Sequence, residues 1–431
     1  MPDSLTGSIE PLIAYAAFAF LAATTLYVLV LGFTSLRRAA VVQRTAESQR
    51  EMLRAQIERI MDERRFDRER NELSWNGYRK FQIARKVMEG GGICSFYLAP
   101  HDSRPLPPFS PGQFLTFQLH IPGQPKPVIR CYSLSDSPNH PDYYRVSIKR
   151  VPPPRDKPDV PPGLSSNFFH ESLNEGDILD VKAPGGSFYL DMTKQTPVVL
   201  IGGGVGLTPV LSMVNAIVES GSKREAYFFY GVRNGEEAVM KEHLERLAAE
   251  NENIHLHLCY SNPKDDEEEG RDFTHGERVS VDLFKRVLPS SNFDFYMCGP
   301  PPMMNSVTEG LAEWGVPEKN VHFEAFGPAS AKKTAPPATA APAEGAPQIT
   351  VTFAKSGKAV PWDASVGSIL DFAEANGVAL DFGCRAGNCG TCITAIKSGE
   401  IDYLHEPGER PESGSCLACI SVPKGDLQLD A

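Results

Sequence analysis

Three cysteines lie close together in the segment DFGCRAGNCGTC, which spans residues 381–392. They are Cys384, Cys389 and Cys392, separated by four residues and then by two, with glycines between them. This C-x4-C-x2-C spacing, with a fourth cysteine further along the chain, is typical of the loop that wraps a plant-type [2Fe–2S] cluster. Small residues let backbone N–H groups approach the sulfides of such a cluster. Zinc is the alternative metal, but its sites favour pairs of C-x2-C motifs.

Two later cysteines, Cys416 and Cys419 in GSCLACISV (414–422), could each supply the fourth sulfur ligand. The spacing alone leaves both open. Four of the nine cysteines are scattered over the first 380 residues, so the thiols are concentrated at the C-terminal end. Clustered thiols in a chain with few other cysteines indicate metal binding in a reducing compartment, and we therefore expect the catalytic domains in the cytoplasm.

A glycine-rich turn follows an apolar run in VVLIGGGVGLTPVLSM, residues 198–213. Such a strand, turn and helix let the backbone approach a pyrophosphate at the positive end of the helix. These glycines do not fit the G-x-G-x-x-G fingerprint closely. Alone, the segment does not distinguish a dinucleotide site from an ordinary strand–helix turn.

The surrounding patterns predict the elements that would position these motifs. Segments 113–121 and 143–151 alternate apolar and polar residues, which predicts an antiparallel β-barrel over 75–192 with a proline-rich insert at 152–163. Strand and helix patterns then alternate over 193–328, which predicts a Rossmann-like α/β domain with a parallel sheet. An Ala/Pro-rich linker at 329–347 leads to a small α+β module at 348–431.

Residues 11–33 contain 23 positions without a charge. As a helix this run is about 35 Å long, enough to cross a hydrocarbon core of about 30 Å. Arg37, Arg38 and Arg44 follow it, and the positive-inside rule places that side in the cytoplasm. We expect residues 1–33 to hold a single-pass anchor in the lipid of the cytoplasmic membrane and 34–74 to form a helical stalk. A cleaved signal peptide is the alternative, although its basic residues normally precede a shorter apolar run.

The net charge of −11 argues against a nucleic-acid-binding protein, which needs a basic face. Within the module at 348–431, eleven Asp and Glu residues stand against six Lys and Arg residues. A redox partner with a basic patch would complement this charge.

Three further stretches resemble the ferredoxin–NAD(P)H reductase superfamily. RCYSL (130–134) matches its R-x-Y-S pattern, GLSSN (163–167) its second flavin-phosphate segment, and CGPPPMM (298–304) its C-G-P-x-x-M nicotinamide segment. They occur in the family's order over residues 75–328, and HFEAFGP (322–328) is similar to a stretch of flavohaemoglobin reductase domains. With a plant-type ferredoxin (β-grasp) domain at the C-terminus, the order resembles the phthalate dioxygenase reductase type.

The resemblance implies roles for the flavin segments. Arg130 would neutralise a flavin phosphate, Tyr132 would pack against the isoalloxazine, and Ser133 would hydrogen-bond near its N5 atom. Gly163 and Ser166, the latter at the start of a predicted helix, would bind the flavin pyrophosphate. FAD is favoured over FMN because GLSSNFFHE (163–171) resembles the FAD-binding flavohaemoglobin pattern.

The nicotinamide and cluster residues follow from the same resemblance. Cys298 and Glu324 would flank the nicotinamide ring during hydride transfer, and Phe326 would cover the flavin. The nicotinamide cofactor would be received by Gly203, Gly204, Gly206, Leu207 and Thr208. The ferredoxin pattern favours Cys419 over Cys416, which implies the ligand set Cys384, Cys389, Cys392 and Cys419.

NADH is favoured over NADPH because Glu236 and Glu237 follow the second strand of the nucleotide domain and would repel a 2′-phosphate. Arg233 is the counter-argument.

These features predict a membrane-anchored reductase that passes electrons from NADH through a flavin to a cluster and then to another redox protein. An oxygenase, hydroxylase, desaturase or cytochrome P450 would suit as that partner. An NADH:quinone-type dehydrogenase and a non-catalytic redox sensor are the alternatives. The nitric oxide reaction of flavohaemoglobins is not expected, because the 74 residues before the flavin segment are too few and too apolar for a globin.

Overall fold

The structure is a computed structural model of the 431-residue chain. It describes residues 9–153, 159–324, 326, 349–383, 385, 387, 389–404, 407 and 411–431. The expected linker, the middle of the proline-rich insert and Cys384 lie outside the described residues. The chain divides into two compact units, Met1–Arg68 and Glu69–Ala431.

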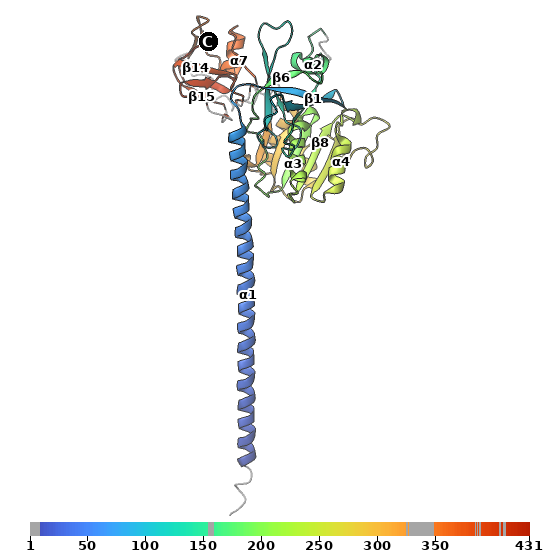
Figure 1. Cartoon of the computed structure of the whole chain (residues 1–431), viewed down its shortest axis with the longest axis vertical. Helices are drawn as coiled ribbons and strands as arrows, with labels where there is room; N and C mark the ends of the chain where they lie inside the picture. The colour runs from blue at the N-terminus through green and yellow to red at the C-terminus, as the bar shows by residue number, and fades with distance from the viewer. Residues whose placement is uncertain are drawn as a thin grey trace, which may run out of the picture. The chain divides into compact units, whose positions relative to one another are not determined.

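A single helix, α1 (Ile9–Leu73), makes up the described part of the N-terminal unit and runs without a break over 65 residues, so its last turn belongs to the second unit (Figure 1). The predicted anchor and the predicted stalk are therefore one continuous helix. Its segment Leu12–Arg38 has a mean hydropathy of 2.1, and none of it is buried. By length and composition this segment is a candidate membrane span, although a signal sequence passes the same test.

An antiparallel six-stranded sheet follows, with the strand order β4-β3-β6-β1-β2-β5. Its alternating side chains bury a core of large aromatic residues, in which Phe169 packs edge-on against Phe96 and Phe117. The outer strands β4 and β5 share no ladder, only an isolated bridge between Leu134 and Val146, so closure into a full barrel is not established. The elements are β1 (Arg79–Gly90), β2 (Ile93–Pro100), β3 (Phe114–Leu119), β4 (Val128–Ser133), β5 (Tyr144–Lys149), α2 (Leu164–Glu171) and β6 (Ile178–Val181).

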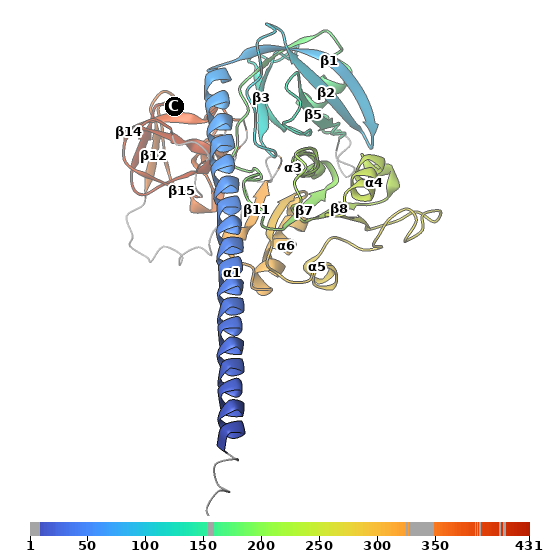
Figure 2. The same ribbon diagram turned by 60° about the horizontal axis from the view of Figure 1, so that its bottom comes forward.

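The next sheet is parallel, with the order β11-β10-β7-β8-β9, as the alternating pattern predicts. Helices α3 and α4 pack on one face and α5 and α6 on the other (Figure 2). Both faces are covered, which explains why the strands are almost continuously apolar. The elements are β7 (Val198–Gly203), η1 (Gly204–Gly206), α3 (Leu207–Glu219), β8 (Ala226–Val232), η2 (Gly235–Glu237), α4 (Lys241–Glu250), β9 (Ile254–Tyr260), α5 (Val281–Val287), β10 (Asp294–Cys298), α6 (Pro301–Glu313), η3 (Glu318–Asn320) and β11 (Val321–Glu324).

The C-terminal part is a small α+β module with a mixed sheet, β13-β12-β18-β14-β16, and a two-stranded sheet, β15-β17. Helix α7 (Ile369–Ala375) begins with a capping box between Ser368 and Asp371, and it leads into the cysteine loop. The remaining elements are β12 (Thr350–Phe353), β13 (Lys358–Pro361), η5 (Ala364–Val366), β14 (Ile393–Ser398), β15 (Ile401–Tyr403), β16 (Ser415–Leu417), η6 (Ala418–Ile420), β17 (Ser421–Pro423) and β18 (Leu427–Leu429).

Candidate active site

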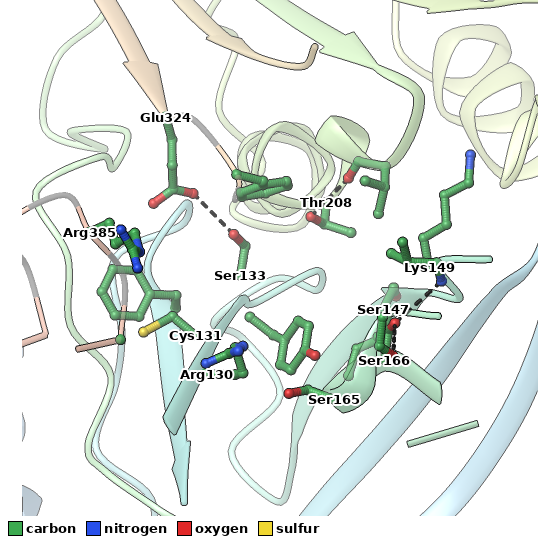
Figure 3. Close-up of a pocket in the computed structure, with 18 of the residues that line it drawn as sticks. Arg130, Cys131, Ser133, Ser147, Lys149, Ser165, Ser166, Thr208, Glu324 and Arg385 are labelled. Carbon is green, nitrogen blue, oxygen red and sulfur yellow. Dashed lines mark hydrogen bonds between the residues drawn. The ribbon is translucent and has the colours of Figure 1, made fainter. Parts of the chain in front are cut away.

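A cavity of about 660 Å³ lies against β4, β5, the start of α2 and the start of α3, and Figure 3 shows residues that line it. Its volume is in the range of cofactor sites. Eight residues that the sequence motifs single out line it: Arg130, Tyr132, Ser133, Gly163, Ser166, Thr208, Glu324 and Phe326. Segments that are nearly 200 residues apart in the sequence therefore meet at one site.

Strand β4 supplies the first wall of the cavity. The Tyr132 ring packs edge-on against Phe117 and Phe169 at centroid distances of 5.8 and 5.2 Å. Burial raises the pKa of Tyr132 far above its usual range, so its phenol stays neutral. Arg130 lines the cavity two positions earlier, and it donates from Nη1 to its neighbour's carbonyl at Ile129.

The start of α2 supplies a second wall. Ser166 Oγ donates to the Gly163 carbonyl at 3.1 Å, and it accepts from the Val151 N–H at 3.3 Å. Ser165 is 4% exposed and lines the cavity, yet its Oγ has no hydrogen-bond partner in the described part of the chain. Buried hydroxyls normally have a partner. An unpaired hydroxyl at a helix N-terminus that shares a cavity with Arg130 fits a flavin phosphate.

Ser133 and Glu324 point toward each other across the cavity (Figure 3). Ser133 Oγ donates to Glu324 Oε2 at 3.0 Å. Glu324 lines the cavity, and burial of its carboxyl raises its pKa to about 8, although the Ser133 hydrogen bond lowers it. At neutral pH Glu324 is therefore mainly a neutral acid. It ends β11, beside Cys298 at the end of β10.

Cys298 has no exposed surface and does not line the cavity. Burial, together with the nearby Glu324, raises the pKa of its thiol well above the usual range. The thiol is therefore protonated and shielded, and its expected place beside the nicotinamide stays a prediction.

The glycine turn joins β7 to α3 through η1 and lies at the carboxyl ends of the parallel strands, where open α/β sheets bind ligands. A Cβ on Gly206 would lie 2.2 Å from the Cys298 carbonyl oxygen, so glycine is required for this approach. Val205 and Thr208 line the cavity, whereas Gly203, Gly204, Gly206 and Leu207 do not. These four instead shape the turn behind it.

The described cysteines of the predicted metal site lie in the C-terminal module. Cys392 Sγ and Cys419 Sγ are 3.1 Å apart and both residues are buried. Cys389 Sγ contacts Thr391 Oγ1 at 3.3 Å. Cys416 is fully buried, and burial raises the pKa of its thiol to about 12. Cys392 and Cys419 thus contact each other through their sulfur atoms, and thiols so close together suit an iron–sulfur or zinc site.

Several lining residues were missed by the sequence motifs. Cys131 lies between the two recognised residues of its motif, and Ser147 and Lys149 come from β5. Phe382, Gly383 and Arg385 reach the cavity from the cysteine loop. Of these residues, Arg385 alone stood out in the sequence, because its long cationic side chain lies among the small residues of the cysteine loop.

Comparisons with known proteins agree with the three-domain organisation. A family model described as an oxidoreductase FAD-binding domain matches residues 92–189, an oxidoreductase NAD-binding domain matches 200–309, and a 2Fe-2S iron-sulfur cluster binding domain matches 351–424. A flavohemoprotein of Halalkalibacterium halodurans is 38% identical over 255 residues, which cover 59% of this chain and 61% of the relative. The chain thus spans about three fifths of the length of the flavohemoproteins it matches.

Two solved structures cover more of the chain. Phthalate dioxygenase reductase is 28% identical with a TM-score of 0.50, and the match covers 83% of this chain and 98% of that one. A type IV self-sufficient cytochrome P450 monooxygenase has a TM-score of 0.56 at 24% identity over 82% of this chain and 41% of the other, a likeness of fold alone.

The cavity and the three matched domains define an NAD(P)H-dependent oxidoreductase that uses FAD and a [2Fe–2S] cluster. The chain carries an FAD-binding, an NAD-binding and a 2Fe-2S cluster binding domain, and their order is that of phthalate dioxygenase reductase, to which the chain is similar.

Proposed function

We propose that this protein is a membrane-anchored, NADH-dependent reductase that passes electrons through FAD and the [2Fe–2S] cluster to a separate redox enzyme. One observation carries this proposal. The flavin motif on β4, the end of β11 and the cysteine-loop residues Phe382, Gly383 and Arg385 line the same cavity. A flavin bound there would have the nicotinamide domain on one side and the cluster loop on another.

FAD, when bound, accepts an electron pair as hydride and releases the electrons one at a time, which couples a two-electron donor to a one-electron cluster. Arg130, Ser165 and Ser166 would hold its phosphates, and Tyr132 would pack on its ring. The neutral Glu324 and the Ser133 hydroxyl keep the cavity free of negative charge as the flavin receives hydride. Gly204, Gly206 and Thr208 would position the nicotinamide cofactor.

NADH is the preferred donor in this proposal. At the end of β8, Arg233 Nε donates to Glu237 Oε1 at 2.9 Å, and Lys264 Nζ lies 2.5 Å from Glu236 Oε1. Each cation already has a carboxylate partner, so a 2′-phosphate would have to displace one. This edge of the sheet is where the ribose of a bound dinucleotide lies.

The cluster ligands in this proposal are Cys384, Cys389, Cys392 and Cys419. The contact between Cys392 and Cys419 supports the choice of the fourth ligand. The acidic ferredoxin module would dock a partner with a basic patch. An oxygenase or cytochrome P450 suits, because phthalate dioxygenase reductase shares the same domain order.

The apolar segment Leu12–Arg38 would hold the protein in the cytoplasmic membrane. Three arginines follow its apolar core at 37, 38 and 44, which supports a cytoplasmic location for the catalytic domains.

Anaerobic stopped-flow spectroscopy of the detergent-solubilised protein tests the central claim. NADH should bleach the flavin first and the cluster second, with catalytic turnover when ferricyanide or cytochrome c is added, and NADPH should react more slowly. Slow, stoichiometric cluster reduction would indicate a sensor, and rapid turnover only with quinone would indicate a quinone dehydrogenase. Pull-down from solubilised membranes would then identify the partner enzyme.

A further inference from the structure

Helix α3 carries a stripe of polar side chains among mostly apolar, buried neighbours. Eleven of its thirteen residues are buried, and most of them are apolar. Thr208, Ser212 and Asn215 follow one another at intervals of four and three residues and therefore share a face. Ser212 has no exposed surface and Asn215 is 2% exposed. Buried polar side chains of this kind need partners.

The partner of Ser212 and Asn215 is Asp136 of the flavin domain. Ser212 Oγ donates to the Asp136 carbonyl at 2.6 Å, and Asn215 Nδ2 donates to Asp136 Oδ1 at 3.1 Å. Asp136 lies three residues after Ser133, just beyond the strand that carries the flavin motif. One residue, through its backbone carbonyl and its carboxylate, thus joins the segment after β4 to the helix that begins at the cofactor turn.

The flavin domain holds Asp136 in place from its own side. Tyr143 Oη donates to Asp136 Oδ2 at 3.1 Å, and Arg145 Nη1 lies 3.4 Å from the same oxygen. The Arg145 guanidinium also donates to the Ser135 carbonyl. His140 approaches Asp136 Oδ1 only to 3.9 Å. Both carboxylate oxygens of Asp136 therefore already have partners, which leaves Asp136 poorly placed to bind a cation with His140 and Glu219.

The nucleotide domain extends the same chain of hydrogen bonds. Because Asn215 uses its nitrogen on Asp136, its Oδ1 accepts from His243 Nε2 at 2.8 Å. His243 Nδ1 then accepts from Arg246 Nη2 at 3.1 Å. Burial, aided by Arg145 and Arg246, lowers the pKa of His243, which keeps this ring neutral. The hydrogen bonds from Arg246 through His243 and Asn215 thus all run toward Asp136.

We propose that Asp136 is a positioning residue for hydride transfer. With Ser212 and Asn215, it sets the distance between the flavin motif on β4 and the dinucleotide turn at the start of α3. Thr208, on the same face of α3, lines the flavin cavity. The inference rests on the proposed transfer of hydride from NADH to FAD. Such a transfer is sensitive to displacements of about 1 Å, which can cost about 100-fold in rate.

The test compares Asn215→Asp, Asp136→Asn and the double variant in FAD- and cluster-loaded protein. Asn215→Asp places a second carboxylate against that of Asp136, so the two negative charges repel each other. The expected result is a flavin-reduction rate constant about 10- to 100-fold below wild type. The double variant restores a donor–acceptor pair of reversed polarity and should recover about tenfold. The measurements are anaerobic flavin reduction by NADH and by 4-deuterated NADH, and the flavin–nicotinamide charge-transfer absorbance.

Ser212→Ala keeps the test decisive if Asn215→Asp does not retain FAD, and it should slow flavin reduction about 2- to 10-fold. Ser220→Ala is the matched control, because within the described part of the chain the Ser220 hydroxyl, just after α3, bonds only the Ile217 carbonyl of that helix. Wild-type rates, isotope effects and charge-transfer absorbance in Asn215→Asp and Ser212→Ala would overturn the inference, as would simple additivity in the double variant. A wild-type protein whose FAD is not reduced by NADH or NADPH would instead contradict the proposed function.

Discussion

At the scale of single residues, the pair formed by Ser133 and Glu324 keeps negative charge out of the cavity. Glu324 is held as a neutral acid by burial, and Ser133 donates to it from a strand 191 residues earlier in the chain. A carboxylate at this point would oppose the arrival of hydride on a flavin, because hydride brings negative charge with it. The Ser133–Glu324 pair therefore links a protonation state to the ease of flavin reduction.

We expect flavin reduction by NADH to slow as pH rises above about 8. The pKa of Glu324 is raised to about 8, so the group is neutral below that pH and charged above it. The rate should fall by up to about tenfold per pH unit above the pKa. Glu324→Gln mimics the neutral acid and should remove this pH dependence. A matching decline in Glu324→Gln, measured by stopped-flow at several pH values, would assign the titration to another group.

Arg385 is the charged residue of the cysteine loop that reaches the cavity. Its Nη1 lies 3.1 Å from Asp371 Oδ1, its Nη2 pairs with Glu374, and its guanidinium lies 4.0 Å from the Phe382 ring centroid. The Arg385 side chain is 12% exposed. The backbone of this residue is in the left-handed region, with φ at 54°. The two carboxylates of α7 and the aromatic ring therefore fix a positive charge inside the loop.

Replacing Arg385 with Gln should lower the midpoint potential of the cluster by about 60 mV, which is a tenfold change for one electron. The reduced cluster is the more negative state, and the variant both removes a cation and leaves two carboxylates unpaired. Glu374→Gln should shift the potential in the opposite direction. A redox titration followed by electron paramagnetic resonance measures both, and equal potentials in all three proteins would refute the electrostatic role.

At the scale of elements, the turn between β7 and α3 brings the dinucleotide segment against β10. The Gly206 backbone lies so close to the end of β10 that a side chain has no room. This contact fixes where α3 begins, and the polar stripe on α3 fixes how it meets the flavin domain.

Gly206→Ala should therefore weaken NADH binding at least about tenfold and lower the free energy of unfolding by about 2 kcal/mol. The physical reason is that the new Cβ would lie 2.2 Å from the Cys298 carbonyl, a backbone atom that moves only with its strand. Gly425→Ala is the control, because a Cβ there meets nothing within 4 Å. Calorimetric NADH titration and thermal unfolding measure the two effects, and an unchanged Gly206→Ala would show that the turn can relax.

At the scale of the whole molecule, the chain combines one long exposed helix with a compact unit that holds all three matched domains. The apolar half of α1 exposes large side chains such as Leu12, Phe18 and Phe20 at 72–74% of their surface. A run of this length is costly to leave in water, because each such side chain prefers an apolar environment by about 1.5–3 kcal/mol.

The full-length protein should resist extraction from membranes by alkaline carbonate and dissolve only in detergent. A variant that lacks residues 1–68 should be water-soluble and keep its FAD, its cluster and its NADH-dependent ferricyanide reduction. Fractionation with an assay of both pools checks this. Cleavage of α1 from the mature protein, seen by N-terminal sequencing, would identify it as a signal sequence instead.

The fold classes were readable from sequence because each depends on local periodicity. Alternating residues predicted the strands of the flavin domain, and continuous apolar runs alternating with helices predicted the parallel sheet. The continuity of α1 was less predictable, because the change in composition after residue 33 suggested two segments, yet Gly32 beside that change does not interrupt the helix. Cys131, Ser147 and Lys149 could not be assigned to the cavity, because one-dimensional patterns do not show which strand faces which.

The sequence by itself determined the chemistry of this protein: the sulfur spacing, the flavin and nicotinamide motifs and their order all depend on neighbouring residues. Only the tertiary structure decided which distant groups meet, such as Ser133 with Glu324, Asp136 with Asn215 and Cys392 with Cys419. It also decided that Cys298 is withdrawn from the cavity. The physical reason is that burial and pairing arise from packing between elements, and local sequence patterns do not specify which distant elements pack together.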